Sequence, residues 1–354
     1  MKAKHLFLVI AASLVGLGLV ICGITVLVVG GDFSKLNTGD EFTKMTYSIS
    51  ASDITSIVLK DQNRNVKLVP SEKDTIDITY YDNEKEYYSF KRNTEELDIE
   101  FDTNKTVNNS FLGIGLNFEV FSDRTVVISI PKEHYPQVNI TTSNGKITAE
   151  NLGFTADTAF STVNGKVEIT DCVFIGSLSV QSKNGRINLK DVLSHKTIDV
   201  STTNARINLE GVNAYEQLKL ETTNAPVEMI SCESEDISVT TTNNSIDVIN
   251  SSCTGLGVCR LTTSNGSITF DRFNGSLVCR TTNGKIIGTL TGLSEDYDIL
   301  SSTTNASNNL PNVQSGIKSD GVVTPSLDVK TTNGAIWVDF LSDGGSILPK
   351  IMAE

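Results

Sequence analysis

Few residues in this sequence have the types and spacing that catalysis requires. Beyond the first five residues the histidines are His134 and His195, and neither accompanies a serine or cysteine nucleophile signature. The P-loop, GxSxG and HExxH motifs, which bind phosphates, present a nucleophile or hold zinc, do not occur. We therefore predict no catalytic, cofactor-binding or metal-binding residues and no enzymatic activity.

One set of charged side chains recurs at a fixed interval of 20 residues: Lys146, Lys166, Arg186 and Arg206. If the segments that carry them stack as β-strands, the cations form a row with a spacing of about 4.8 Å. Such a row could bind an anionic cell-wall polymer such as teichoic acid. The alternative is that Glu150, Glu168 and Glu210 neutralise the row through surface ion pairs.

The four basic residues belong to a sequence repeat between residues 138 and 340, and stacking of its copies would bring them into one row. Each copy has an asparagine preceded, two residues earlier, by threonine or once by Ser182. Successive asparagines are 20 residues apart in the first four intervals and 18 to 28 apart in the others. The asparagines are Asn144, Asn164, Asn184, Asn204, Asn224, Asn243, Asn265, Asn283, Asn305 and Asn333.

Apolar and polar residues alternate within each copy, which is typical of β-strands. Asn-Gly favours a hairpin turn, so a series of antiparallel hairpins is one interpretation. However, Ala205, Ala225 and Ala306 follow the asparagine in three copies, and they resist the positive φ that such a turn needs. We therefore predict an all-β fold, a parallel β-solenoid of about 20-residue coils in which the asparagine side chains form a hydrogen-bonded ladder.

The cysteines fit the same repeat. Cys172 and Cys232 occupy a position that other copies fill with leucine or valine, so we expect them in the core. Cys259 and Cys279 lie in adjacent copies of the repeat, so they could either form a disulfide or pack as free thiols in the core, and we favour core packing. No CxxC or Cys/His spacing indicates zinc.

The N-terminal region predicts a membrane anchor. Residues 6–30 contain no charged side chain, and about 25 residues of helix can span a bilayer core of about 30 Å. Lys2 and Lys4 precede this run, and acidic residues follow it. The positive-inside rule then places residues 1–5 in the cytoplasm and the rest of the chain outside. We expect a single-pass cell-membrane protein.

The remaining segments complete the expected organisation. Residues 31–44 form a juxtamembrane linker, and residues 45–137 read as irregular β N-terminal coils with a cap that shields the first open edge. Residues 341–354 form a C-terminal cap or tail.

The net charge of −13 disfavours nucleic acid as a partner, because phosphate binding needs a concentrated basic face.

The repeated segments resemble the bacterial putative-adhesin family of β-strand-repeat proteins, a domain of unknown function. The resemblance covers about residues 45–340 and depends on TTSNGKIT, STVNGKVEI, QSKNGRINL, STTNARINL and TTNGKI. It implies a cell-envelope location, often with one transmembrane helix, and it brings no catalytic residues.

The sequence thus predicts a membrane-anchored, extracytoplasmic, non-catalytic module for adhesin-like binding or scaffolding in the bacterial envelope. Its partners would be its own membrane and a cell-wall polymer or another envelope protein. Two alternatives remain at this point: a polysaccharide lyase of the β-helix type, and an accessory subunit of an envelope-stress sensor.

Overall fold

The structure, a computed structural model, describes residues 41–104, 123–310 and 324–341 and five helical residues near the N-terminus, Ser13, Val15, Gly16, Gly18 and Val20. Most of the expected membrane span at residues 6–30 lies outside the described residues, as do the linker up to residue 40 and the tail from residue 342. Within the described part of the chain, no helix has the length and apolar character needed to cross a membrane.

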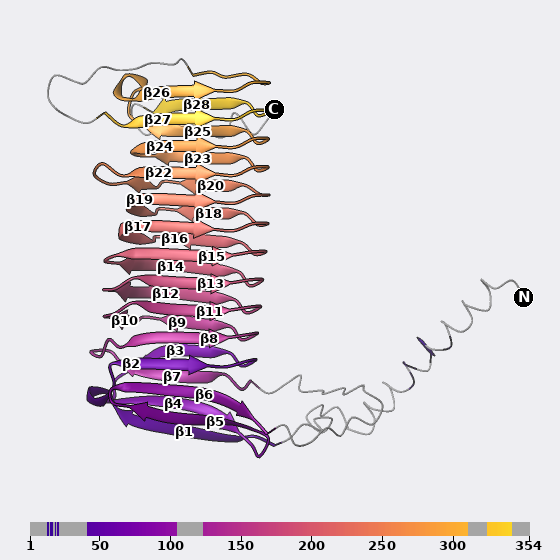
Figure 1. Cartoon of the computed structure of the whole chain (residues 1–354), viewed down its shortest axis with the longest axis vertical. Coiled ribbons are helices and arrows are strands. Elements are labelled where there is room, and N and C mark those ends of the chain that lie inside the picture. Colours follow the sequence, from indigo (N-terminus) through magenta and orange to yellow (C-terminus); the bar gives the residue numbers. More distant parts are fainter. Residues whose placement is uncertain are drawn as a thin grey trace, which may run out of the picture.

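The chain forms a rod of stacked β coils, and the prediction of an all-β solenoid is confirmed (Figure 1). Each regular coil has three sides. In one coil, β11 (Thr158–Thr162) is side one, the start of β12 (Val167–Phe174) is side two, and the end of β12 is side three. Strands of neighbouring coils pair in parallel on each side, and every pairing between residues 137 and 341 is parallel.

The strands of each side share one stacking order. On side one this order is β6 (Glu96–Thr103), β2 (Ser56–Lys60), β8 (Gln137–Thr142), β11, β13 (Leu178–Ser182), β15 (Thr197–Thr202), β17 (Asn213–Glu221), β19 (Glu233–Thr240), β22 (Val258–Thr262), β24 (Ser276–Arg280), β27 (Ser326–Lys330) and β26 (Asp298–Ser302). On side two it is β7 (Val126–Pro131), β3 (Val66–Ser71), β9 (Ile147–Glu150), β12, β14 (Ile187–Ser194), β16 (Ile207–Glu210), β18 (Val227–Ile230), β20 (Ile246–Ile249), β23 (Ile268–Phe273), β25 (Ile286–Thr291) and β28 (Ile336–Leu341). Side three consists of β10 (Gly153–Phe154), β21 (Ser252–Cys253) and parts of β12, β14, β17 and β19.

The core is a column of apolar side chains enclosed by the three sides. Because side chains alternate along a strand, every second residue points inward, as in β14, where Ile187 and Leu189 are at most 1% exposed. Aromatic rings fill the N-terminal coils, where Phe154 and Phe174 stack with ring centroids 4.8 Å apart. The coils therefore stabilise one another by burial and cannot fold as isolated units.

Close contact between coils explains the hydroxyl residue before each asparagine of the repeat and the glycine that follows most of them. The Thr162 hydroxyl accepts a hydrogen bond from the backbone N–H of Gly165 at 3.0 Å and donates to the carbonyl of Gly145, in the preceding coil, at 3.4 Å. A Cβ atom on Gly165 would lie 1.8 Å from that same carbonyl oxygen. Glycine is therefore required here by the approach of two backbones, and its φ is not in the left-handed region.

At the N-terminal end, the coils do not stack in sequence order. The coil of β2 and β3 lies between the coil of β6 and β7 and the coil of β8 and β9. The outer edges of β6 and β7 then pair antiparallel with β5 (Glu86–Asn93) and β4 (Thr75–Asp82), and β1 (Thr43–Ser50) pairs antiparallel with β4. This antiparallel layer covers the open edge of the rod, together with a short 3-10 helix, η2 (Ala51–Asp53).

The C-terminal end has the same exception. β27 pairs with β24 on one edge and with β26 on the other, so the last coil of the sequence is inserted beneath the coil that begins at β26. The spatial order of the asparagines therefore differs from their order in the sequence here. A second 3-10 helix, η3 (Ser294–Asp296), precedes β26, and residues 324–341 return to fill the slot between two coils.

The five described cysteines are free thiols and all are buried. Cys172 and Cys232 replace apolar residues on side three, and Cys259 and Cys279 lie in the core without a bond between them. Burial raises the pKa of the Cys172 and Cys232 thiols to about 11. These cysteines therefore act as small apolar side chains.

We expect Gly165→Ala to lower the free energy of unfolding by about 1–3 kcal/mol, because its methyl group forces two coils apart. Thermal and urea denaturation followed by far-UV circular dichroism would measure this. Ala205→Gly, at the equivalent corner of a coil that already accommodates a methyl group, is the control and should change stability by less than about 1 kcal/mol. Equal stability of Gly165→Ala and the wild type would contradict the close approach.

We also expect stability to fall between pH 9 and pH 11. The unfolded thiols ionise near pH 9, whereas the folded thiols of Cys172 and Cys232 hold their protons to about pH 11. The unfolded state therefore releases protons first and gains up to about 1.4 kcal/mol per thiol for each pH unit in this window. In a Cys172→Val/Cys232→Val variant, the alkaline decrease in urea midpoint should be shallower; identical pH profiles would refute the assignment.

Candidate functional site

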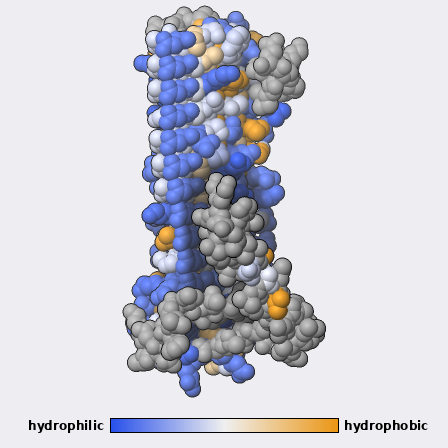
Figure 2. All heavy atoms as spheres, turned by 90° about the vertical axis from the view of Figure 1, so that its right-hand side faces the viewer, coloured by the Kyte–Doolittle hydropathy of each residue, from blue (hydrophilic) through white to orange (hydrophobic). Residues whose placement is uncertain are grey.

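The asparagine side chains form a column along the corner between sides one and two. In each neighbouring pair, the side-chain N–H of one asparagine donates to the side-chain oxygen of the other at 2.6–2.9 Å. The column contains all ten asparagines of the repeat, and it ends with Asn283, Asn333 and Asn305 in that spatial order. Figure 2 looks at this corner and shows a continuous hydrophilic stripe along the rod.

The column also contains Asn63, which the sequence analysis missed. The Asn144 side-chain N–H donates to the Asn63 side-chain oxygen at 2.6 Å. Asp61 takes the place of the threonine, and its carboxylate accepts the backbone N–H groups of Asn63 and Arg64, both at 2.8 Å. The signal in the sequence was an Asp-x-Asn triplet 81 residues before the regular repeat, too far away to be recognised as the adjacent coil.

The asparagine column has a structural role. Each internal asparagine uses its oxygen and one N–H on its neighbours, as Asn184 does with Asn164 and Asn204. These side chains are exposed, so each bond contributes of the order of 1 kcal/mol or less. The column fixes the register between coils, and register determines which other side chains lie in line.

The four basic residues lie just beyond this corner, at the start of side two. The backbone N–H of Val167 donates to the carbonyl of Arg186 at 3.0 Å, and that of Ile147 donates to the carbonyl of Lys166 at 2.9 Å. These bonds place Lys146, Lys166, Arg186 and Arg206 in consecutive coils of the parallel stack. The structure therefore brings all four together as one row.

Only part of this row is neutralised. Lys146 forms an ion pair with Glu168, and Arg206 forms one with Glu228 at 3.6 Å. Each pair joins a cation to a carboxylate in the next coil, in a position exposed to solvent, where such pairs contribute little stability. Of the other expected partners, Glu150 instead pairs with Lys67 at 3.1 Å and Glu210 with Lys190 at 2.9 Å.

The two central cations, Lys166 and Arg186, are exposed, and neither makes an ion pair with any described residue. They lie in adjacent coils between the two neutralised ends of the row. Next to them, side two has a shallow polar groove of about 410 Å³, whose lining includes Glu168, Asn188 and Asn208. The row therefore has paired cations at its two ends and two cations without a described carboxylate partner at its centre.

A second column, also missed from the sequence, forms the corner between sides two and three. At this position the backbone has φ between 49° and 63° in seven successive coils. The residues are mostly those that tolerate the left-handed conformation, and this composition was the available signal. They are Asn151, Asp171, Asp191, Gly211, Ser231, Asn250 and Arg272.

We find no constellation for catalysis among the described residues. No group of three or more His, Cys, Asp or Glu side chains there could hold a metal ion. Burial lowers the pKa of His134, which lies in the connection between β7 and β8, and His195 stacks on Tyr215 with centroids 5.0 Å apart. Neither histidine lies beside a buried acid and a nucleophile, the geometry on which general acid–base catalysis depends.

The known proteins that this chain is similar to are distant in sequence. No curated protein sequence matches the chain. Three crystal structures are similar over most of their length. A putative adhesin from Parabacteroides distasonis ATCC 8503 has a TM-score of 0.40 and 13% identity, covering 86% of this chain and 98% of its own. A putative adhesin from Bacteroides fragilis NCTC 9343 has a TM-score of 0.36 and 13% identity, covering 84% and 97%. A putative cell adhesion protein from Clostridium sporogenes ATCC 15579 has a TM-score of 0.23 and 10% identity, covering 85% and 100%.

The sequence signature of a family also matches, and it does so over residues 54–269, which include the first coil, most of the asparagine column and the whole basic row. This stretch is more than half of the chain. The protein therefore belongs to the Toastrack DUF4097 family.

Proposed function

We propose that this protein is a non-catalytic binding module of the bacterial cell envelope, anchored by residues 6–30, and that its basic row binds an anionic wall polymer such as teichoic acid. The observation that carries the proposal is the pair of exposed cations, Lys166 and Arg186, for which no described carboxylate is a partner. The stacked coils hold both at a fixed spacing, so a polymer with regularly spaced phosphates can meet them without reordering the protein.

The charge of the whole chain makes such binding local. With a net charge of −13, the chain as a whole repels a polyanion, so attraction has to come from local groups of cations such as the row. Solvent-exposed contacts of this kind are screened by salt over about 8–10 Å at physiological ionic strength. The affinity of a single row for the polymer should therefore be weak and sensitive to salt. Several copies of the protein could then bind along one polymer chain, each through its own row.

The row can be tested by retention on purified cell walls. We expect a variant in which serine replaces all four basic residues of the row to lose retention, and Lys166→Ser/Arg186→Ser to lose most of it. Two cations near an anionic surface contribute about 2 kcal/mol, which corresponds to about 30-fold in affinity. Retention by the wild type should also fall as salt is raised.

The matched control is Lys183→Ser/Lys196→Ser, which removes two exposed cations that likewise have no ion pair within the described residues, but lie outside the row. It should retain wild-type binding. Walls stripped of teichoic acid identify the ligand. Unchanged retention of the four-serine variant, or equal loss in the control, would refute the role of the row.

The anchor and the location have a separate test. Because residues 6–30 are uncharged and long enough to span a bilayer, the full chain should remain in the membrane fraction after a carbonate wash. In spheroplasts, added protease should degrade the solenoid while cytoplasmic markers stay intact. A chain found in the soluble fraction, or one protected from protease, would contradict an anchored extracytoplasmic module.

A further inference from the structure

The outer surface of side three carries large exposed apolar side chains in several coils of its N-terminal half. Tyr135 is 45% exposed, Val173 40%, Ile175 46% and Tyr215 60%. Parallel pairing fixes their positions: Val173 lies over Gly153, and the backbone N–H of Ile175 donates to Phe154 at 2.8 Å. A group of large apolar side chains exposed together on one face indicates a binding surface, whereas isolated ones need no explanation.

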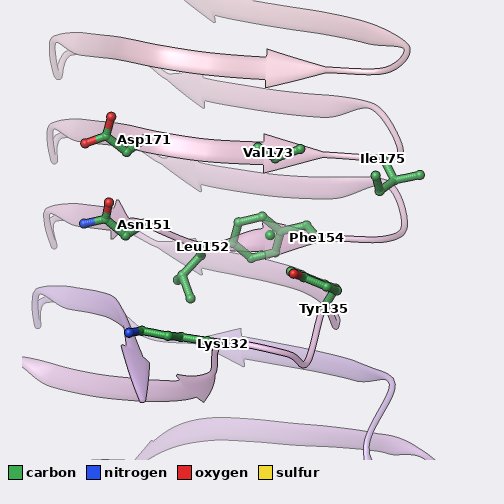
Figure 3. Close-up of a pocket in the computed structure, with 9 residues that line it drawn as sticks. Lys132, Tyr135, Asn151, Leu152, Phe154, Asp171, Val173 and Ile175 are labelled. Atoms are coloured by element: carbon green, nitrogen blue, oxygen red, sulfur yellow. The ribbon is translucent and has the colours of Figure 1, made fainter. Parts of the chain in front are cut away.

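At the N-terminal end of this surface there is a pocket of about 510 Å³ (Figure 3). Its wall includes Phe154, Val173 and Ile175, and the Tyr135 ring lies at its edge, below Ile175. Pockets of this volume, apolar with a few polar groups, are typical of small-molecule and saccharide-sized ligands. A flat protein–protein interface would not need such a concavity.

The Tyr135 ring is held in place by two features of the next coil. Gly153 leaves room for it, since a Cβ atom there would lie 2.2 Å from both Cδ1 and Cε1 of the ring. The Thr155 hydroxyl donates to the Tyr135 carbonyl at 2.6 Å. The equivalent of Gly153 in the next coil is Val173, so glycine here is a departure from the repeat that makes a seat for the ring.

The charged groups around the pocket carry no net positive charge. Lys132 forms an ion pair with Glu72, while Asn151 and Asp171 lie at the left-handed corner above it. The Tyr135 hydroxyl has no hydrogen bond to any described residue. The rim therefore offers hydrogen-bond donors and acceptors around an apolar wall, without a net positive charge that would select an anion.

We propose that this pocket binds a neutral glycan. A pyranose ring has an apolar face of C–H groups, which fits the open face of an aromatic side chain, and a rim of hydroxyls, which fits amide, carboxylate and phenol groups. A second exposed ring, Tyr215, lies on the same side of the rod, four coils from Tyr135 or about 19 Å away, and it stacks on His195. A linear chain of sugars can follow that direction, so the ligand class is an uncharged linear polysaccharide. This site lies on a different side of the coil from the basic row.

Isothermal titration with glucose, cellotetraose, chitotetraose and mannotetraose tests the proposal on the full chain in detergent. We expect saturable binding of at least one tetrasaccharide, tighter than that of the monosaccharide. Tyr135→Ala should weaken it at least tenfold, whereas Tyr135→Phe, which keeps the ring, should stay within about threefold of the wild type.

Gly153→Val is the second variant. It keeps Tyr135 but places, at the position where the ring lies, the valine that the next coil has at the equivalent position. It should also weaken binding at least tenfold. Trp337→Ala is the control, since it removes an aromatic side chain of similar exposure, 46%, at the far end of the rod. Circular dichroism verifies that each variant is folded. Lys166→Ser/Arg186→Ser should bind the glycan normally, which separates this proposal from the basic row.

Absence of saturable binding to all three tetrasaccharides would overturn the proposal, as would equal affinity of Tyr135→Ala and the wild type. Self-association is the competing explanation for an exposed apolar surface. If sedimentation shows a dimer that Ile175→Asp dissociates, the surface is an interface between two copies and the glycan assignment is wrong.

Discussion

The contact between successive coils at the asparagine corner is the constraint on which the rest of the structure depends. Three groups act together there: a hydroxyl such as that of Thr162 joins two backbones, the asparagine amide joins two side chains, and glycine allows the backbones to meet. Because all three act between the same two coils, a shift of one residue in register would break all of them. The corner thus converts a sequence period of about 20 residues into a fixed alignment of coils.

A fixed alignment means that a repeated sequence position becomes a line of side chains on the surface. The basic row beside the first corner and the left-handed residues of the second corner are two such lines. Whether a charged side chain in such a line is neutralised then depends on the side chains of the adjacent coils. Lys146 pairs with Glu168 in the next coil and not with Glu150 in its own, because the diagonal across the strand pair brings those two atoms within reach.

The central coils could be predicted from the sequence and the ends could not. Asparagine spacing and apolar alternation are local patterns, and they indicate strand, corner and parallel stacking together. The coil containing Asn63 lies beside Asn144, 81 residues away, and the coil of Asn333 lies between those of Asn283 and Asn305. Nothing local encodes such insertion, since any coil with the right corner fits any slot. Ion-pair partners were missed for a similar reason, because several glutamates of suitable spacing compete for each cation.

In a solenoid of near-identical coils, specific chemistry must come from departures from the repeat. Most coils share their inward residues and their corners, so those positions cannot distinguish one part of the rod from another. Gly153, where the next coil has Val173, opens the seat for Tyr135 beside a pocket with a mainly apolar wall. Lys166 and Arg186 differ from the two ends of their row by lacking a carboxylate partner within the described structure. Both places lie in the N-terminal half of the rod, nearest to the residues that would join it to the membrane. If residues 6–30 anchor the chain as proposed, this placement would favour ligands close to the membrane surface over those at a distance.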